Sequence, residues 1–358
     1  MSRFFSHRLD RLVPYTPGEQ PRDQQYIKLN TNESPFPPSP GVLSAVADAA
    51  GRLQLYSDPT CRDLCAAMAA VYGISPDRVV MTNGSDEVLN FAFMAFADED
   101  HPLVFPAVTY GFYPVFAELN RIPYEEIPLR NDFSVDPADY MNLGGKTVVI
   151  ANPNAPTGLA LSRDEIESIV RSNPDGMVII DEAYVDFGGE SALPLVDKYD
   201  NLLVTGTFSK SRSLAGARLG FGFAQESVIA DLNTVRYSTN HYNINRMTSA
   251  AGCAALAEND YYMENCRTIM ENRAYTTEAM QSMGFEVLPS KTNFIFARTP
   301  RMSGEALYAK LKQRGILVRH FTKAGIEDFN RITIGTRAQM ETLVATVRTI
   351  LTESGDTL

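Results

Sequence analysis

Short apolar runs recur along the middle of the chain, and segments long enough for helices separate them. Such runs suit strands that are buried on both faces of a sheet. Strands that alternate with helices form a mostly parallel sheet with helices on both sides. We therefore predict an α/β fold and expect any ligand at the carboxyl ends of the strands. The runs are Val79–Met81, Pro102–Phe105, Thr147–Ala151, Val178–Ile180, Leu202–Thr205 and Leu219–Phe223.

The length and charge of the chain limit the class of protein that it can be. At 358 residues it exceeds one ordinary hydrophobic core, which favours two domains. The net charge of −11 argues against general binding to nucleic acid or anionic membranes. No run approaches the roughly 18 apolar residues of a membrane span, and the N-terminus lacks the apolar core of a signal peptide. Four scattered cysteines indicate a reducing cytoplasm, without disulfides or a metal site.

Proline spacing and the positions of apolar runs suggest three parts. Seven prolines fall between residues 14 and 40, and proline fixes φ and lacks an N–H, so residues 1–40 are expected to form an extended arm. Residues 41–245 would form a large domain. A helical stretch around residues 245–273 leads into a smaller α+β domain, residues 246–358, on which the arm is expected to pack. Its strand-like runs are Thr292–Ala297, Ile316–Arg319 and Asn330–Gly335.

Lys210 and Asp181 each follow an apolar run and together suggest a covalently bound cofactor. Small serines flank Lys210 and leave room for a planar group, and a lysine amine can form a Schiff base. An ionised carboxylate at the end of a buried strand is costly unless paired, and a protonated pyridine nitrogen would be that partner for Asp181. Tyr184, three residues later, can reach a phenolic oxygen on the same ring. These are groups that pyridoxal 5'-phosphate (PLP) requires. Open alternatives are a solvated lysine, a capping aspartate and a core tyrosine.

A Gly-Ser turn between the first run and a helix-like segment is a candidate phosphate site. Gly84, Ser85 and Asp86 would expose backbone N–H groups at the positive end of the helix dipole. An ordinary capping box would look the same. Near Lys210, the polar residues Thr207, Ser209 and Arg218 would complete the phosphate contacts, with arginine supplying a charge-assisted bond.

Further candidates are aromatic or cationic. Tyr110 follows the second run and either stacks on a cofactor ring or fills the core. Arg319 and Arg331 lie on predicted strands of the smaller domain. A guanidinium there either binds a substrate carboxylate or phosphate in a bidentate way or simply faces solvent.

With these residues assembled, the chain resembles the fold-type I PLP enzymes of the class I and II aminotransferases, and within them the histidinol-phosphate aminotransferase group. The resemblance runs nearly end to end. It implies a large domain with a mostly parallel, seven-stranded sheet covered by helices, and a smaller α+β domain. The matching segments are Leu29–Pro35, Leu55–Pro59, Asn83–Glu87, Asn154–Gly158, Ile180–Tyr184, Thr207–Lys210, Leu214–Gly220 and Arg331–Thr336.

The resemblance also implies roles for individual residues. Lys210 would carry the cofactor and shuttle protons, Asp181 would contact the pyridine nitrogen, and Tyr184 the phenolic oxygen. Tyr110 would stack on the ring. The turn residues Gly84 and Ser85, with Thr207, Ser209 and Arg218, would bind the phosphate, and Asp86 is a further cofactor-binding candidate. Tyr56 would reach the phosphate in the neighbouring subunit of a homodimer.

Substrate contacts follow from the same resemblance. Arg331 would hold the carboxylate of glutamate or 2-oxoglutarate, and Arg319, Asn32 and Tyr15 would contact the second substrate. The family's usual asparagine before Pro-Thr-Gly is Ala155 here, so Asn154 is our candidate for its cofactor contact. Ser57 and the segment Asn240–Asn245 also depart from the family pattern.

The expected activity is transamination of small amino and keto acids, with histidinol phosphate and glutamate as the preferred pair in histidine biosynthesis. Aromatic amino-acid transamination and decarboxylation of a phosphorylated amino acid, as in threonine-phosphate decarboxylases, are the alternatives. A non-enzymatic nucleotide-binding module would need G-x-G-x-x-G or a Walker loop at a strand–helix turn, and neither stands there.

Overall fold

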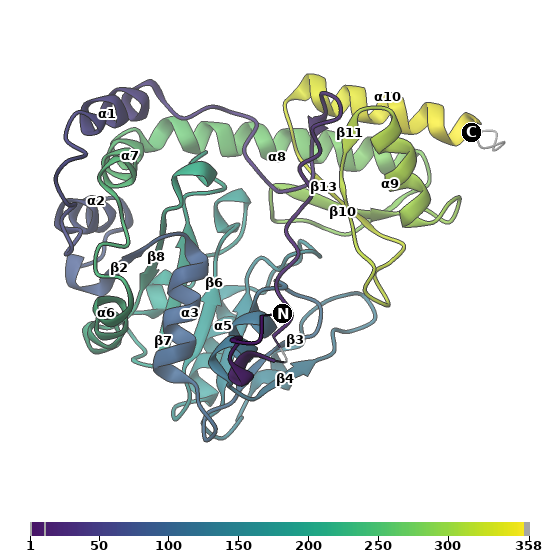
Figure 1. The fold of residues 1–358 in the computed structure, drawn as a ribbon. Helices are drawn as coiled ribbons and strands as arrows, with labels where there is room; N and C mark the ends of the chain where they lie inside the picture. The colour runs from purple at the N-terminus through teal and green to yellow at the C-terminus, as the bar shows by residue number, and fades with distance from the viewer. Residues whose placement is uncertain (1, 11, 354–358) are drawn as a thin grey trace.

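A seven-stranded sheet forms the centre of the larger part of the molecule (Figure 1). The computed structural model describes residues 2–10 and 12–353. The strand order is β2-β8-β7-β6-β5-β3-β4, and all neighbours are parallel except β8, which is antiparallel to β2 and to β7. The strands are β2 (Val79–Thr82), β3 (Leu103–Pro106), β4 (Tyr124–Ile127), β5 (Thr147–Ala151), β6 (Val178–Asp181), β7 (Leu202–Thr207) and β8 (Gly220–Phe223). The predicted α/β class and mostly parallel sheet are confirmed.

Helices cover both faces of this sheet because its strands are apolar on both sides. Along β5, Val148 and Ile150 belong to one core cluster and Val149 to another, as expected when successive side chains point to opposite faces. The first cluster includes residues of α1 (Pro40–Ala50), α2 (Arg62–Tyr72), α5 (Arg163–Ser172) and α7 (Arg246–Ala257). The second includes residues of α3 (Ser85–Phe96), α4 (Tyr113–Asn120) and α6 (Glu226–Thr239).

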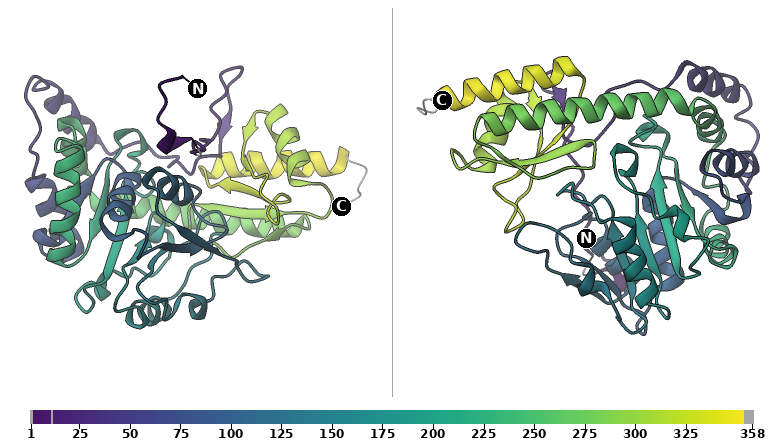
Figure 2. Two further views of the ribbon diagram at one scale, coloured as in Figure 1. Left: turned by 60° about the horizontal axis from the view of Figure 1, so that its bottom comes forward. Right: turned by 180° about the vertical axis from the view of Figure 1, so that it is seen from behind.

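A smaller unit with its own sheet and core lies to one side of the large sheet (Figure 2). Its antiparallel order is β12-β13-β10-β9, from β9 (Glu286–Val287), β10 (Phe294–Arg298), β12 (Arg319–His320) and β13 (Asn330–Thr333). The helices α8 (Asn259–Ser282), α9 (Gly304–Gln313) and α10 (Arg337–Glu353) pack around it. The single helical stretch expected around residues 245–273 is two helices, α7 and α8, which Glu258 separates.

The N-terminal arm crosses between the two sheets. β1 (Ile27–Lys28) pairs in parallel with β11 (Ile316–Leu317) of the smaller unit. The run predicted as one strand over residues 316–319 therefore divides between β11 and β12, which belong to different sheets. The proposed boundaries at residues 40 and 245 stay predictions. None of the helices among the described residues is both long and apolar enough to span a membrane.

Candidate active site

Two adjoining cavities open at the carboxyl ends of the parallel strands. The lysine cavity, of about 390 Å³, is lined by residues of the segments that follow β2, β6 and β7. The arginine cavity, of about 350 Å³, lies toward the smaller unit. Five residues line both cavities. Lys210 is one of them and therefore lies where the two cavities meet. The shared residues are Thr31, Tyr110, Ala155, Tyr184 and Lys210.

Lys210 reaches this junction because β7 ends three residues earlier, at Thr207. Its Nζ donates to the carbonyl oxygen of Thr31 in the arm, at 3.3 Å, and lies 5.9 Å from the centre of the Tyr184 ring. Ser209 is buried, and its backbone N–H donates to Thr207 Oγ1 at 3.1 Å. The loop is therefore held by its own hydroxyl groups, and the lysine amine is left facing both cavities.

Asp181 is a buried carboxylate at the end of β6, in register with Ala151 of β5 and Thr205 of β7. Tyr113 Oη donates to its Oδ2 at 2.9 Å, and the Ala183 N–H donates to Oδ1 at 3.3 Å. Burial raises the pKa of the Asp181 carboxyl to about 6, although these hydrogen bonds oppose the shift. A cationic ligand group in the lysine cavity would favour the ionised form and relieve the cost of burial.

The turn between β2 and α3 forms a cradle at the other end of the lysine cavity. Gly84 precedes the first residue of α3 and has φ +81°, and no side chain caps the helix. A Cβ on Gly84 would lie 2.5 Å from Arg218 Nη2, so the guanidinium packs directly on the turn. Arg218 pairs with Asp86 at 3.1 Å, and Asp86 accepts a second hydrogen bond from Tyr110 Oη at 2.8 Å. Uncapped N–H groups beside an arginine suit a phosphate.

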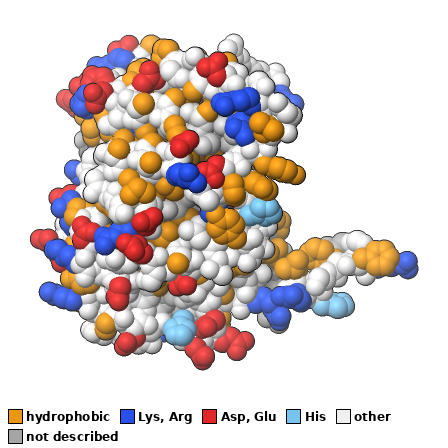
Figure 3. All heavy atoms as spheres, turned by 90° about the vertical axis from the view of Figure 1, so that its left-hand side faces the viewer, with side chains coloured by type: hydrophobic (Ala, Val, Ile, Leu, Met, Phe, Trp, Pro, Cys, Tyr) orange, Lys and Arg blue, Asp and Glu red, His pale blue; other side chains and the backbone are white. Residues whose placement is uncertain are grey.

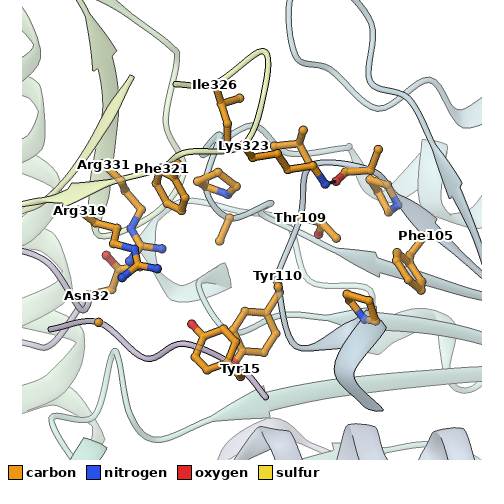
Figure 4. A pocket seen from close by; sticks show the side chains of 18 of the residues that line it. Tyr15, Asn32, Phe105, Thr109, Tyr110, Arg319, Phe321, Lys323, Ile326 and Arg331 are labelled. Carbon is orange, nitrogen blue, oxygen red and sulfur yellow. Dashed lines mark hydrogen bonds between the residues drawn. The ribbon is translucent and has the colours of Figure 1, made fainter. Parts of the chain in front are cut away.

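Arg319 and Arg331 line the arginine cavity together (Figure 4). They are directly opposed on β12 and β13. Like charges in that position repel, unless an anion lies between them. Arg331 donates to the Asn30 carbonyl oxygen at 3.0 Å, and its Nε has no hydrogen-bond partner among the described residues. Burial lowers the pKa of the Arg331 guanidinium, with Arg319 contributing in the same direction.

Aromatic side chains close the same cavity. The ring of Tyr15, from the arm, lies 4.6 Å from that of Phe112 and 6.4 Å from that of Tyr110. Figure 4 shows Tyr15 and Tyr110 side by side, across the cavity from the two arginines. The cavity therefore combines an aromatic wall with a cationic one.

Two predicted residues lie elsewhere. Asn154 is buried outside the lysine cavity. Its side-chain amide is engaged in hydrogen bonds with Val108, Thr109 and Thr157. It is Ala155 that lines the cavity, and it carries no donor. Tyr56 is 78% exposed on the surface, stacked on Tyr242 at 4.5 Å, and lines neither cavity of its own chain.

Sequence reasoning missed several residues that the structure brings to the site. Tyr113, in the first turn of α4, donates a hydrogen bond to Asp181. This contact depends on how α4 is oriented against the sheet, which the sequence does not show. Thr31 accepts the bond from Lys210 through its backbone, which leaves no signal in residue type. Lys323 adds a fourth cation to the arginine cavity, after Arg319, Arg331 and Lys210, from a segment with no recognisable strand pattern.

Known proteins resemble this chain over most of its length. Residues 24–347 match the family described as "Aminotransferase class I and II". The chain is 49% identical over 354 residues to histidinol-phosphate aminotransferase 1 of Bordetella parapertussis, covering 98% of this chain and 99% of that protein. It is 48% identical to histidinol-phosphate aminotransferase 1 of Bradyrhizobium diazoefficiens, covering 98% and 100%.

Among solved structures, histidinol-phosphate aminotransferase from Sinorhizobium meliloti, in complex with pyridoxal 5'-phosphate, superposes with a TM-score of 0.85. The two are 26% identical, over 92% of each chain. A Thermus thermophilus aspartate aminotransferase variant, 18% identical, shares the fold with a TM-score of 0.82 over 97% of this chain and 99% of its own. The match to the family covers most of the sequence, and the relatives match from end to end. The chain therefore belongs to the class I and II aminotransferases, a family of PLP-dependent enzymes.

Proposed function

We propose that Lys210 carries PLP in the lysine cavity, with the phosphate at the turn before α3 and the ring nitrogen against Asp181. The buried Asp181 carboxylate supports this, because it has no positively charged partner among the described residues, and a protonated ring would supply one. Gly84 supports it as well, because a side chain there would fill the space between the turn and Arg218. Tyr184 and Tyr110 line the same cavity and would contact the ring oxygen and the ring face.

We infer that the reaction is transamination between histidinol phosphate and 2-oxoglutarate. The arrangement of Arg319 and Arg331 around one cavity carries this proposal. Two opposed guanidinium groups suit a carboxylate or a phosphate, and the neighbouring tyrosines suit a flat substrate ring. The names of the relatives that match from end to end support the same substrate.

The residues divide the chemistry among them. PLP, when bound, supplies a ring that accepts the negative charge that develops on the substrate's α-carbon. Arg331 holds the substrate carboxylate and so fixes the orientation of the α-carbon beside Lys210. Once the substrate's amino group has replaced it on the cofactor, the freed Lys210 amine would take the α-proton from the substrate and, as an ammonium group, would later give that proton up. Asp181 stays ionised and keeps the ring nitrogen protonated. Tyr15 lines the arginine cavity and is held there by packing on Phe112, so it would limit the access of water from that side.

We propose further that the active unit is a cytoplasmic homodimer in which Tyr56 reaches the neighbouring active site. Exposed apolar residues of α1 and of the segment that follows it, and Tyr242, which stacks on Tyr56, support this, because monomers rarely leave such a group uncovered. They are Leu43, Leu53, Leu55 and Tyr242, with exposed fractions from 37 to 59%. Orange side chains are visible on the face shown in Figure 3, which is the left-hand side of Figure 1, where α1 and α2 lie.

Single-turnover spectroscopy tests the proposed reaction. The PLP-loaded protein is mixed with one amino donor at a time, and the visible absorbance of the bound cofactor is followed. We expect histidinol phosphate and glutamate to convert it to its amine form, and Lys210→Ala to lose both the conversion and the covalent adduct trapped by borohydride. Lys198→Ala, a surface lysine paired with Glu167, is the control and should behave as wild type.

The outcomes separate the alternatives. Conversion by aromatic amino acids without conversion by histidinol phosphate would replace the proposed substrate. Release of carbon dioxide from a phosphorylated amino acid, without the amine form, would indicate a decarboxylase. A protein that binds no PLP, or a Lys210→Ala variant with unchanged turnover, would overturn the proposal.

A further inference from the structure

Asn32 is a buried residue between the two units of the fold, and it connects the smaller unit to Tyr184. It is 1% exposed. Its backbone N–H donates to Thr333 Oγ1 at 3.0 Å, and Thr333 Oγ1 donates to Asn32 Oδ1, also at 3.0 Å. Asn32 Nδ2 donates to Tyr184 Oη at 2.8 Å. A chain of hydrogen bonds thus runs from β13, through the arm, to the edge of the lysine cavity.

Each bond in this chain has a defined donor and acceptor. A backbone N–H can only donate, so the oxygen of Thr333 is the acceptor there. The one hydrogen of the Thr333 hydroxyl then goes to Asn32 Oδ1, which can only accept. In this arrangement the oxygen end of the Asn32 amide faces Thr333 and the nitrogen end faces Tyr184. Because Tyr184 Oη accepts this bond, its own hydrogen is free to point elsewhere.

We propose that Thr333 and Asn32 are positioning residues that aim the hydroxyl hydrogen of Tyr184 into the lysine cavity. The inference rests on the proposed function, because the acceptor would be the ring oxygen of PLP beside Lys210. Without the Thr333 hydroxyl, the Asn32 amide can turn over and present its oxygen to Tyr184. The tyrosine hydrogen would then be donated to Asn32 and lost to the cofactor.

The segment that carries Asn32 has other attachments, so the hydroxyl can be removed alone. The Thr333 N–H donates to the Leu29 carbonyl oxygen at 2.9 Å, and Asn293 Nδ2 donates to the Asn32 carbonyl oxygen at 3.0 Å. Valine has the shape of threonine and suits a buried strand position such as Thr333. Thr333→Val therefore removes one hydroxyl while the arm stays bound to the backbone of β13 and to Asn293, which precedes β10.

The visible absorbance band of the PLP-loaded protein changes with pH, and the pH at which half of the change has occurred is its midpoint. This midpoint reports on the proposed hydrogen bond from Tyr184 Oη to the ring oxygen of PLP. A hydrogen bond donated to the ring oxygen of PLP disperses the negative charge on that oxygen. The oxygen then stabilises less strongly the proton on Lys210 Nζ, the nitrogen that would be linked to PLP. Losing the donor therefore raises the midpoint. Lys210 and Arg331 are charged groups close to Tyr184, Asp181 lines the same cavity, and Tyr110 and Tyr113 are ionisable neighbours. The substitutions described here leave all of these residues in place.

A double-mutant cycle tests the proposal. We expect Thr333→Val to raise the midpoint by about one pH unit, the size expected for one hydrogen bond to a charged group. In a Tyr184→Phe background the midpoint is already raised, and Thr333→Val should add no further shift. Thr333→Ser restores the hydroxyl and should return the wild-type midpoint.

Each remaining outcome decides the question. An unchanged midpoint in Thr333→Val, or an equal shift with and without the tyrosine hydroxyl, would overturn the positioning role. A wild-type protein with no visible band would instead overturn the proposed cofactor. If Thr333→Val does not fold, Asn32→Asp takes its place, since aspartate tolerates the φ of +56° and its carboxylate can only accept. If the proposal holds, Asn32→Asp shifts the pH midpoint more when Tyr184 is present than in the Tyr184→Phe background.

Discussion

Asp181 and Glu182 follow one another from the end of β6, and their surroundings separate their roles. Both are buried. Asp181 lines the lysine cavity, whereas Glu182 accepts hydrogen bonds from Ser191 Oγ at 2.6 Å and from the Ala192 N–H at 2.5 Å. Burial raises the pKa of the Asp181 carboxyl to about 6 and that of Glu182 to about 8. Only the first of these carboxyl groups is available to a ligand.

The affinity for PLP should therefore depend on pH through Asp181. Above a pH of about 6 the carboxylate is ionised and attracts a protonated ring nitrogen, and below it the attraction is lost. We expect affinity to fall as the pH is lowered from 7 to 5. Asp181→Asn should weaken binding at pH 7 by about tenfold or more, the value of a charged hydrogen bond, and should remove most of this pH dependence. Equilibrium dialysis measures both.

Glu182→Gln is the matched control, because it changes a neighbouring buried carboxyl group that lies outside the cavity. Its pH profile for PLP binding should follow that of the wild type. If Asp181→Asn keeps the wild-type profile, the pairing of Asp181 with the ring nitrogen is wrong.

Single residues could be predicted from sequence where their position follows from a strand end. Lys210 and Asp181 follow apolar runs, and parallel strands bring such positions to one edge of a sheet. Asn154 shows the limit of this reasoning. A shift of one residue along a turn decides whether Asn154 or Ala155 faces the cavity, and residue type does not fix that register.

At the scale of elements, the phosphate cradle depends on the close approach of β8 to the start of α3. β8 begins at Gly220, and a Cβ there would overlap the backbone of Gly84 and Ser85. To make room for a side chain at Gly220, the turn at Gly84 and Ser85 would have to shift. That shift would move the N-terminus of α3 away from Arg218. Glycine at this position therefore keeps the uncapped N–H groups and the guanidinium within reach of one ligand.

Gly220→Ala should weaken PLP binding and also destabilise the fold, by about 1–3 kcal/mol, because the added carbon meets backbone rather than a flexible side chain. Denaturant unfolding and PLP titration measure the two effects. Gly51→Ala is the control, since a Cβ there would make only an ordinary contact, 3.5 Å from the Asp48 carbonyl oxygen. Similar effects of both substitutions would contradict the packing argument.

In the large sheet, the strands that contain apolar runs were predictable, and the strand without one was not. All six runs are strands of the large sheet. The seventh strand, β4, reads Tyr-Glu-Glu-Ile and is largely exposed at the edge of the sheet, so it has no apolar run to reveal it. Its existence followed only from the resemblance to the family. The break between α7 and α8 was missed because neither proline nor glycine marks it.

For the whole molecule, the open question is whether one chain completes its own active site. Tyr56 stands on an exposed apolar face and lines neither cavity. If it serves the neighbouring subunit, two defective chains can complement each other. A hybrid of Lys210→Ala and Tyr56→Phe chains would contain one site with both wild-type residues.

We expect this hybrid to recover the cofactor affinity of the wild type at one of its two sites. The Tyr56→Phe homodimer should bind PLP about tenfold more weakly, because one hydrogen bond to the phosphate is lost. Refolding the two chains together and titrating PLP measures the recovery. Mixing Tyr56→Phe with wild type gives the reference curve. Hybrids that show no high-affinity site would place Tyr56 in its own subunit or outside the site altogether.

The arm makes the first part of the chain depend on the last. Asn32 meets Thr333 and Asn293, and β1 pairs with β11, so the pocket around Lys210 is closed by contacts some three hundred residues apart in sequence. Such distant contacts form late in folding. During synthesis the large sheet can assemble before Asn293, β11 and Thr333 leave the ribosome. The contacts that hold the arm beside Lys210 cannot form until then. Capture of the vitamin is thus tied to a finished polypeptide, and a prematurely terminated one would lack a closed pocket.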